Sequence, residues 1–127
     1  MYLTRDRVDD GQQLPLARFL ANVAATVRDG NRRDWRVMSA RGYGEDVCDL
    51  EDSLEGRASI PVRMDELLRI SSDPDQWFYD LHCVEDVSGL RLGVLDSGAL
   101  YIRGSDELCR SVTAHFEDVT RVNPDHV

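Results

Sequence analysis

Few side chains in this sequence are suited to nucleophilic catalysis. A nucleophilic site would use Cys83 or Ser97 as the nucleophile and His82 as the base. No nucleophile elbow or cysteine-protease motif surrounds either candidate nucleophile. His82 and Cys83 are neighbours in a segment that alternates like a β-strand, so their side chains should point to opposite faces. We therefore predict no catalytic residue and no enzymatic activity.

Metal and nucleotide chemistry have equally little support in the residue spacing. No two His residues stand at the i, i+4 spacing of a helical metal site, and there is no Cys-x-x-Cys motif. Residues 42–44 lack the third glycine of a dinucleotide-binding loop, and a chain without Lys has no Walker motif. We expect no metal and no cofactor. Cys48, Cys83 and Cys109 are then reduced structural thiols, as in a cytoplasmic protein.

An acidic segment is the first feature that points to function. It places six acids and no base within eleven residues: Glu45, Asp46, Asp49, Glu51, Asp52 and Glu55. Such a charge density would attract a basic partner protein and speed its association. The alternative is a solvated hairpin edge, whose charges oppose edge-to-edge aggregation.

The second feature is one face of a predicted strand over 77–84. Alternation places one set of side chains toward the core: Trp77, Tyr79, Leu81 and Cys83. The outer face then carries Phe78, Asp80, His82 and Val84, and the next strands add Arg91, Gly93, Tyr101 and Arg103. Aromatic and Arg side chains on an open sheet are typical of protein-binding surfaces. The alternative is an ordinary half-solvated face with cross-strand Asp–Arg pairs. Further aromatic anchors, if exposed, would be Trp35 and Tyr43.

The first half of the chain must position the acidic segment. Residues 1–13 are polar and read as a loose arm or a short edge strand. A helix follows, with Pro15 in its first turn, an apolar stripe over 16–27, and Gly30 as its stop. A hairpin comes next, with a turn at 42–44 and a return strand over 47–50 that carries the acids.

The second half has clearer elements. We predict an edge strand over 58–62, where Pro61 removes a donor, and a short helix over 64–70. The strand over 77–84 and a hairpin around residues 96–98 form a meander, and Ser105 begins a second amphipathic helix. This helix has His115 on its apolar stripe, where we expect it largely buried. Residues 120–122 add a closing edge strand and 123–127 a tail.

These elements predict one α+β domain over 1–127. We expect a two-layer sandwich, with a mostly antiparallel sheet and two main helices on one face. The predicted core comprises Leu16, Phe19, Leu20, Val23, Leu108, Val112, Phe116, Tyr79 and Leu81.

Charge narrows the classes of partner. The formal net charge is -9, although residues 1–44 are net positive, so the acidic excess lies entirely in residues 45–127. Such a surface repels phosphate backbones, and we expect no direct nucleic-acid binding. No apolar segment is long enough to span a bilayer, which predicts no membrane association and a cytoplasmic protein.

Residues 77–119 resemble small acidic immunity proteins of bacterial toxin–immunity systems. The resemblance lies in a strand, the pair Asp96-Ser97, a strand ending in residues 101–104, and an amphipathic helix ending in residues 116–119. It implies a non-enzymatic inhibitor that binds and occludes a cognate toxin, and it carries over no individual residue.

We therefore expect a protein-binding module, an immunity-type inhibitor of a basic protein such as a toxin. The acids over 45–55 would steer the partner, whose active site would then be occluded. A structural subunit or small homo-oligomer is the alternative.

Overall fold

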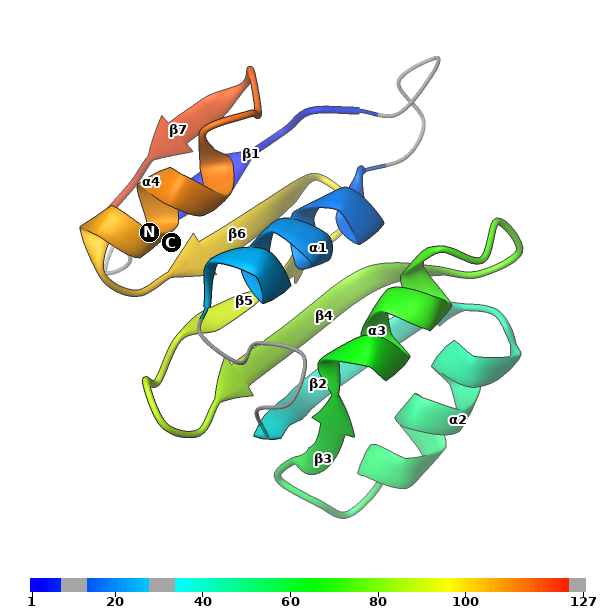
Figure 1. Cartoon of the computed structure of the whole chain (residues 1–127). Coiled ribbons are helices and arrows are strands. Elements are labelled where there is room, and N and C mark those ends of the chain that lie inside the picture. The colour runs from blue at the N-terminus through cyan, green and yellow to red at the C-terminus, as the bar shows by residue number, and fades with distance from the viewer. Residues whose placement is uncertain (8–13, 28–33, 124–127) are drawn as a thin grey trace.

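The computed structural model describes residues 1–7, 14–27 and 34–123, which form a helical layer on a seven-stranded antiparallel sheet (Figure 1). The elements are β1 (Tyr2–Thr4), α1 (Leu16–Thr26), β2 (Asp34–Tyr43), α2 (Glu45–Leu54), β3 (Ile60–Arg63), α3 (Met64–Ser71), β4 (Trp77–Glu85), β5 (Arg91–Leu95), β6 (Ala99–Arg103), α4 (Asp106–Thr113) and β7 (Val119–Arg121). The strand order is β3-β2-β4-β5-β6-β1-β7. The predicted α+β class and antiparallel sheet are confirmed.

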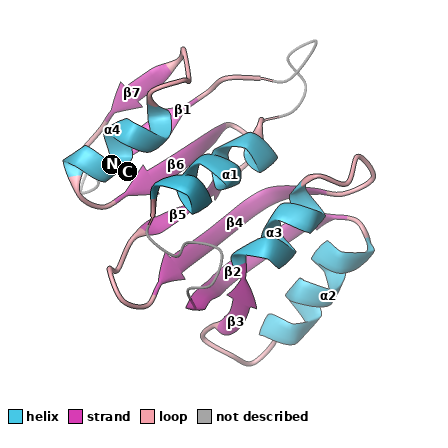
Figure 2. Cartoon of the chain, viewed as in Figure 1, coloured by secondary structure: helices cyan, strands magenta, loops and turns pink. Residues whose placement is uncertain are grey.

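Helices α1, α3 and α4 lie across one face of the sheet, and α2 lies beside the β2–β3 edge (Figure 2). The apolar stripe of α1 buries Leu16, Phe19, Leu20 and Val23, as predicted. Phe19 meets Phe116, which follows α4, edge to face with ring centroids 5.8 Å apart. Helix α1 ends at Thr26, and Gly30 lies outside the described residues.

The predicted return strand over 47–50 is wrong, because residues 45–54 form helix α2. Gly44 turns the chain with φ +116°, a conformation that favours glycine. Val47 is buried, and Leu50 and Leu54 pack beside it at helical spacing. The apolar residues of this segment therefore recur with the period of a helix. The acidic residues lie along this helix and not on a hairpin edge.

A β-bulge in β4 overturns part of the predicted alternation. The pairing with β2 shifts between Arg41 and Gly42, so that Tyr79 is left between two paired positions. Leu81 and Cys83 are buried as predicted, but Tyr79 is 38% exposed and Phe78 is buried in the core. The extra residue inverts the pattern on its N-terminal side. Trp77 and Tyr79 were therefore wrongly placed on the core face, and Phe78 on the outer face.

The meander and α4 largely follow the prediction. Asp96 and Ser97 adopt positive φ in the β5–β6 turn, and the Ser105 side chain accepts a hydrogen bond from the Leu108 N–H. Helix α4 ends at Thr113, earlier than its apolar stripe suggested. Leu108 is consequently only half-buried and His115 is exposed, both contrary to expectation, whereas Val112 and Phe116 are buried.

The sequence predicted both edges of the sheet but not the position of the N-terminal strand. Strand β3, with Pro61, and strand β7 are the edges, as expected. The N-terminal strand β1 is internal, because it pairs with β6 on one side and β7 on the other. Residues 2–4 are therefore neither a loose arm nor an edge strand.

Candidate protein-binding surfaces

Helix α2 and the residue directly after it present to solvent four carboxylates that the fold does not use. We define the acidic ridge as Glu45, Asp49, Asp52 and Glu55. The spacing of four and three residues places Glu45, Asp49 and Asp52 on one face of the helix, opposite Val47 and Leu54, and Glu55 follows at its C-terminal end. None of the four side chains forms an ion pair or hydrogen bond with the residues that the structure describes. Like charges on adjacent turns repel each other, so the ridge costs rather than adds stability.

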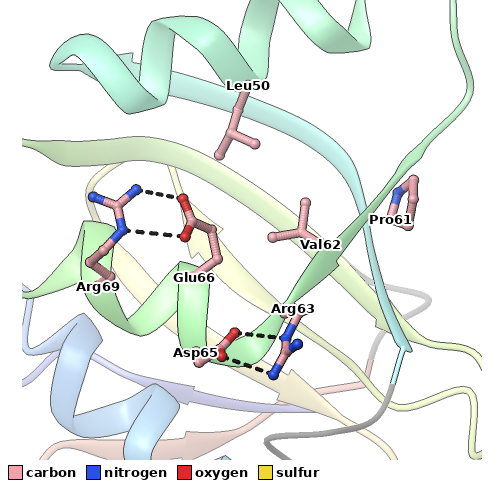
Figure 3. A pocket seen from close by; sticks show the side chains of 7 residues that line it. All are labelled: Leu50, Pro61, Val62, Arg63, Asp65, Glu66 and Arg69. Carbon is pink, nitrogen blue, oxygen red and sulfur yellow. Dashed lines mark hydrogen bonds and ion pairs between the residues drawn. The ribbon is translucent and has the colours of Figure 1, made fainter.

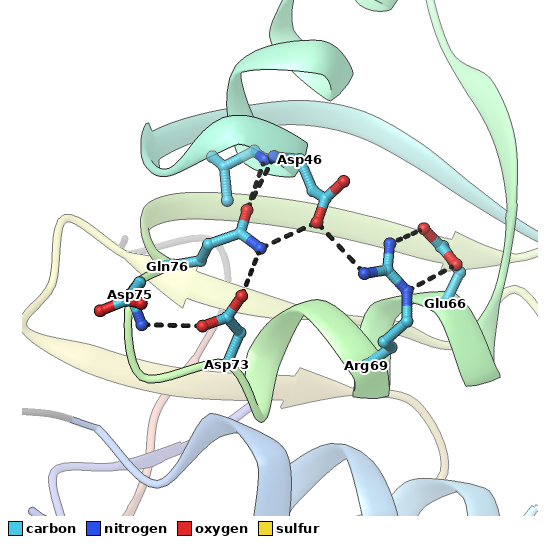
Figure 4. Close-up of polar contacts among 7 residues, drawn as sticks. Asp46, Glu66, Arg69, Asp73, Asp75 and Gln76 are labelled. Atoms are coloured by element: carbon cyan, nitrogen blue, oxygen red, sulfur yellow. Dashed lines mark hydrogen bonds and ion pairs between the residues drawn. The ribbon is translucent and has the colours of Figure 1, made fainter.

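The other two acids of the predicted segment are structural. Glu51 Oε1 accepts a hydrogen bond from the backbone N–H of Gly42, at 2.9 Å. Asp46 Oδ2 accepts one from Gln76 Nε2 at 2.8 Å and one from Arg69 at 3.2 Å (Figure 4). The bond from Gln76, and then that from Arg69, lowers the pKa of Asp46. The predicted segment therefore divides into a free ridge and two anchoring side chains.

Gln76 is the residue that sequence reasoning missed. Its side-chain Oε1 accepts hydrogen bonds from the backbone N–H groups of Asp46 and Val47, at 2.8 and 3.2 Å. It thus satisfies two of the unpaired donors at the N-terminus of α2 from a loop thirty residues away. Asp73 accepts from Gln76 as well, and this bond helps to lower the pKa of Asp73 after the larger effect of the Asp75 backbone N–H. No local sequence signal marks such a distant cap.

A shallow groove runs between α2 and α3 over strand β3 (Figure 3). Leu50, Pro61 and Val62 supply its apolar lining, and its volume is about 510 Å³. Its charged lining residues are paired with each other, Arg63 with Asp65 and Arg69 with Glu66. The groove adds apolar contact area next to the helix that carries the acidic ridge.

The face of the sheet opposite the helices, here called the open face, is the second surface. No helix of the described residues lies on it (Figure 2). The predicted residues found there are Asp80, His82, Val84, Arg91, Gly93, Tyr101 and Arg103. Phe78 is absent from it, for the bulge described above turns its side chain into the core.

Polar contacts order the middle of the open face. Asp80 pairs with Arg41 at 2.7 Å and accepts the Asp96 N–H at 2.9 Å. His82 Nδ1 lies 2.8 Å from the Tyr101 hydroxyl. Gly93 sits opposite both, and a Cβ on it would come within 2.9 Å of the Tyr101 ring. Tyr101 packs with Leu3 and Ala99 and is buried although it lies on the open face, and this burial raises the pKa of its hydroxyl.

Arg91 and Arg103 stand directly opposite each other on β5 and β6. Both are exposed, and neither forms an ion pair or hydrogen bond with the described residues. Every other Arg that the structure describes, apart from Arg57, has such a partner. The two guanidinium groups face each other without a counter-charge, although the chain has an excess of acids. Their mutual repulsion lowers the stability of the sheet.

Three aromatic side chains gather at one end of the sheet; we call Tyr43, Trp77 and Tyr79 the aromatic cluster. Tyr43 and Trp77 stack with ring centroids 4.7 Å apart, and Tyr79 meets Trp77 edge-on at 5.9 Å. Tyr43 is 55% exposed. Of the aromatic anchors considered from sequence, Trp35 and Phe78 are buried and only Tyr43 is exposed. Trp77 and Tyr79 also line a hollow of about 560 Å³ that reaches to α1 and α3.

The side chains considered for catalysis do not converge. Cys83 is buried in the core, which raises its thiol pKa to about 12, while His82 lies on the open face. Burial also raises the pKa of Cys109, and Cys48 is exposed on α2. Among the described residues, no three His, Cys, Asp or Glu side chains are placed to hold a metal ion.

Comparisons of the chain with protein-family models, curated proteins and solved structures give no match. None of the helices in the described ranges combines the length and apolar character needed to cross a bilayer. The acidic ridge and the open face are therefore the features from which we infer a function.

Proposed function

We propose that this chain is a protein-binding module, an immunity-type inhibitor that neutralises a partner protein with a basic surface. The observation that supports the proposal is the acidic ridge of α2, whose carboxylates have no partner among the described residues. The two acids of α2 that hold the fold together are engaged, and the remaining three, together with Glu55 directly after the helix, are all exposed to solvent. A basic protein would supply the missing counter-charges.

The ridge is placed to act early in association. The four like charges of the ridge, within residues 45–55, create a local negative potential that extends over about one Debye length, ~8 Å at physiological ionic strength. Such fields raise association rates by roughly 10- to 1,000-fold for a partner of opposite charge. The α2–α3 groove, which is lined by Leu50 and Val62, lies on the other side of α2 from the ridge. Steering would thus come from the ridge, and apolar contact from the opposite side of the same helix.

The test uses the product of the open reading frame adjacent to the gene for this chain. We expect this product to slow bacterial growth when expressed alone, and co-expression of the chain to restore growth. With the purified pair, the variant Glu45→Gln/Asp49→Asn/Asp52→Asn should lower the association rate about tenfold at low salt and flatten its salt dependence.

The matched control removes the same number of charges elsewhere. The variant Asp86→Asn/Glu107→Gln/Glu117→Gln changes three exposed acids that lie outside α2 and have no side-chain partner among the described residues. It should leave the rate within about twofold of the parent protein. Equal slowing by both variants would show that only net charge matters, and an unchanged rate in the ridge variant would remove α2 from the interface.

A further inference from the structure

The tertiary structure separates the charges that the sequence mixes. Acids dominate the helical side, on α2, on α3 and in the loop after α3. The open face is basic, with Arg36, Arg41, Arg91 and Arg103 set against Asp80 and Asp96. A protein of net charge -9 therefore has one cationic face, and this face has no covering element among the described residues.

Two of the three described Arg side chains that lack partners stand together on the open face, and the third, Arg57, lies after α2. Arg91 and Arg103 face each other across β5 and β6, and Val84 of β4 is directly opposite Arg91 on the other side. Arg91 and Arg103 come from neighbouring strands whose backbones are about 4.8 Å apart, so their guanidinium groups can together hold carboxylates through paired N–H donors. His82 and the Tyr101 hydroxyl lie in the neighbouring row. This arrangement is suited to carboxylates supplied from outside the described fold.

Anchoring groups for a protein partner stand farther along the same strand. From the bulge at Tyr79 to Val84 is five residues of strand, roughly 16 Å. The aromatic cluster at that end is partly exposed. Trp, Tyr and Arg are the side chains that most often dominate the energy of protein interfaces.

We propose that the open face is a second docking surface, which binds an acidic protein segment. The segment places carboxylates against Arg91 and Arg103 and an apolar side chain against the aromatic cluster. This surface is opposite the helical layer and has the opposite charge to the acidic ridge, so the inference does not depend on the function proposed for α2. The chain would then hold two different proteins on its two sides.

A nucleic acid fits the open face less well. A polyanion would meet the net negative charge of the whole molecule at long range, whereas a protein segment is attracted locally. Single-stranded nucleic acids also need exposed aromatic faces on which bases stack. Tyr101, the aromatic residue in the row next to the two free Arg side chains, is only 7% exposed. The exposed Tyr43 lies at the other end of the sheet, and one of its faces is already stacked on Trp77.

The experiment is a nuclear magnetic resonance titration of the full chain with a short peptide that alternates Glu and Leu. We expect saturable shifts in the side-chain N–H signals of Arg91, Arg103 and Trp77. The variant Arg91→Ser/Arg103→Ser should weaken binding at least about tenfold, equivalent to ~1.4 kcal/mol. The control Arg57→Ser removes the other described Arg without a partner and should bind as the parent does. A peptide with Gln in place of Glu should also bind at least about tenfold more weakly.

Three results would overturn the proposal. The Glu-Leu peptide could leave the open-face signals unmoved while the spectrum of the double variant shows an intact fold. Oligothymidylate could shift the same signals at lower concentration, which would make the face a nucleic-acid surface. The signals could shift as the protein alone is concentrated, which would make a second copy the occupant. The ridge variant of α2 should bind the peptide normally, so failure of either proposal is distinguishable from failure of the other.

Discussion

At the scale of single residues, side chains of one type have opposite roles depending on their partners. Asp46 and Asp49 are both acids of α2, but Asp46 is held by Gln76 and Arg69 while Asp49 faces solvent. Gln76 is almost fully buried and uses both its oxygen and its nitrogen in hydrogen bonds. A buried amide with all its partners ties the loop before β4 to the start of α2.

Replacing this amide tests that role. Gln76→Ala removes the acceptor of two backbone N–H groups, and we expect a loss of about 1–2 kcal/mol in the free energy of unfolding, comparable with the loss of an N-cap. Urea denaturation followed by circular dichroism measures it. The neighbouring variant Asp75→Ala, which retains its backbone N–H, should stay within about 0.5 kcal/mol of the parent. Equal stabilities of the two variants would contradict the capping role.

At the scale of elements, the helical layer is joined by a few large side chains. Phe116 lies just beyond α4 and contacts Phe19 of α1, and the Arg18 guanidinium lies 4.4 Å from the centre of its ring. The adjacent His115 is exposed. The packing of α1 beside α4 therefore depends on Phe116 much more than on the residue before it.

Truncation to Ala should lower the stability far more at Phe116 than at His115. Phe116→Ala removes a large buried side chain and leaves a cavity between α1 and the end of α4, so we expect a loss of about 3–5 kcal/mol. His115→Ala should change stability by less than about 0.5 kcal/mol. Both values come from chemical denaturation. A loss below about 1 kcal/mol for Phe116→Ala would show that the site collapses around the cavity, against the packing described.

At the scale of the whole molecule, charge is distributed by face. The acidic ridge adds repulsion within the helical side, while ion pairs such as Arg69 with Asp46 relieve it only in part. The net charge of -9 should therefore oppose the compact state at low ionic strength. Added salt shortens the Debye length from ~30 Å at 0.01 M to ~8 Å at 0.15 M and screens this repulsion.

The melting temperature should consequently rise by a few degrees between these two salt concentrations. Differential scanning calorimetry measures the rise. The variant Glu45→Gln/Asp49→Asn/Asp52→Asn should melt higher at low salt and gain less from added salt, because the repulsion within the ridge is already gone. A melting temperature that falls on adding salt would mean that attractive ion pairs outweigh the net repulsion.

The sequence by itself determined the features that depend on neighbours along the chain. The apolar stripe of α1, the turn at Asp96 and Ser97, the Ser105 cap and the α+β class all follow from local spacing and residue type. These signals act over one or two turns of helix or one hairpin, so they can be read without knowing the fold.

The tertiary structure alone decided the features that depend on distant segments. The cap on α2 comes from Gln76, the bulge at Tyr79 depends on pairing with β2, and β1 becomes internal only when β7 pairs beside it. The division of the acidic segment into a free ridge and two anchors has the same origin, as does the cationic open face. The physical reason is that hydrogen-bond partners and counter-charges depend on which segments lie close together in the folded chain. Periodicity indicates only the direction of each side chain on its own element.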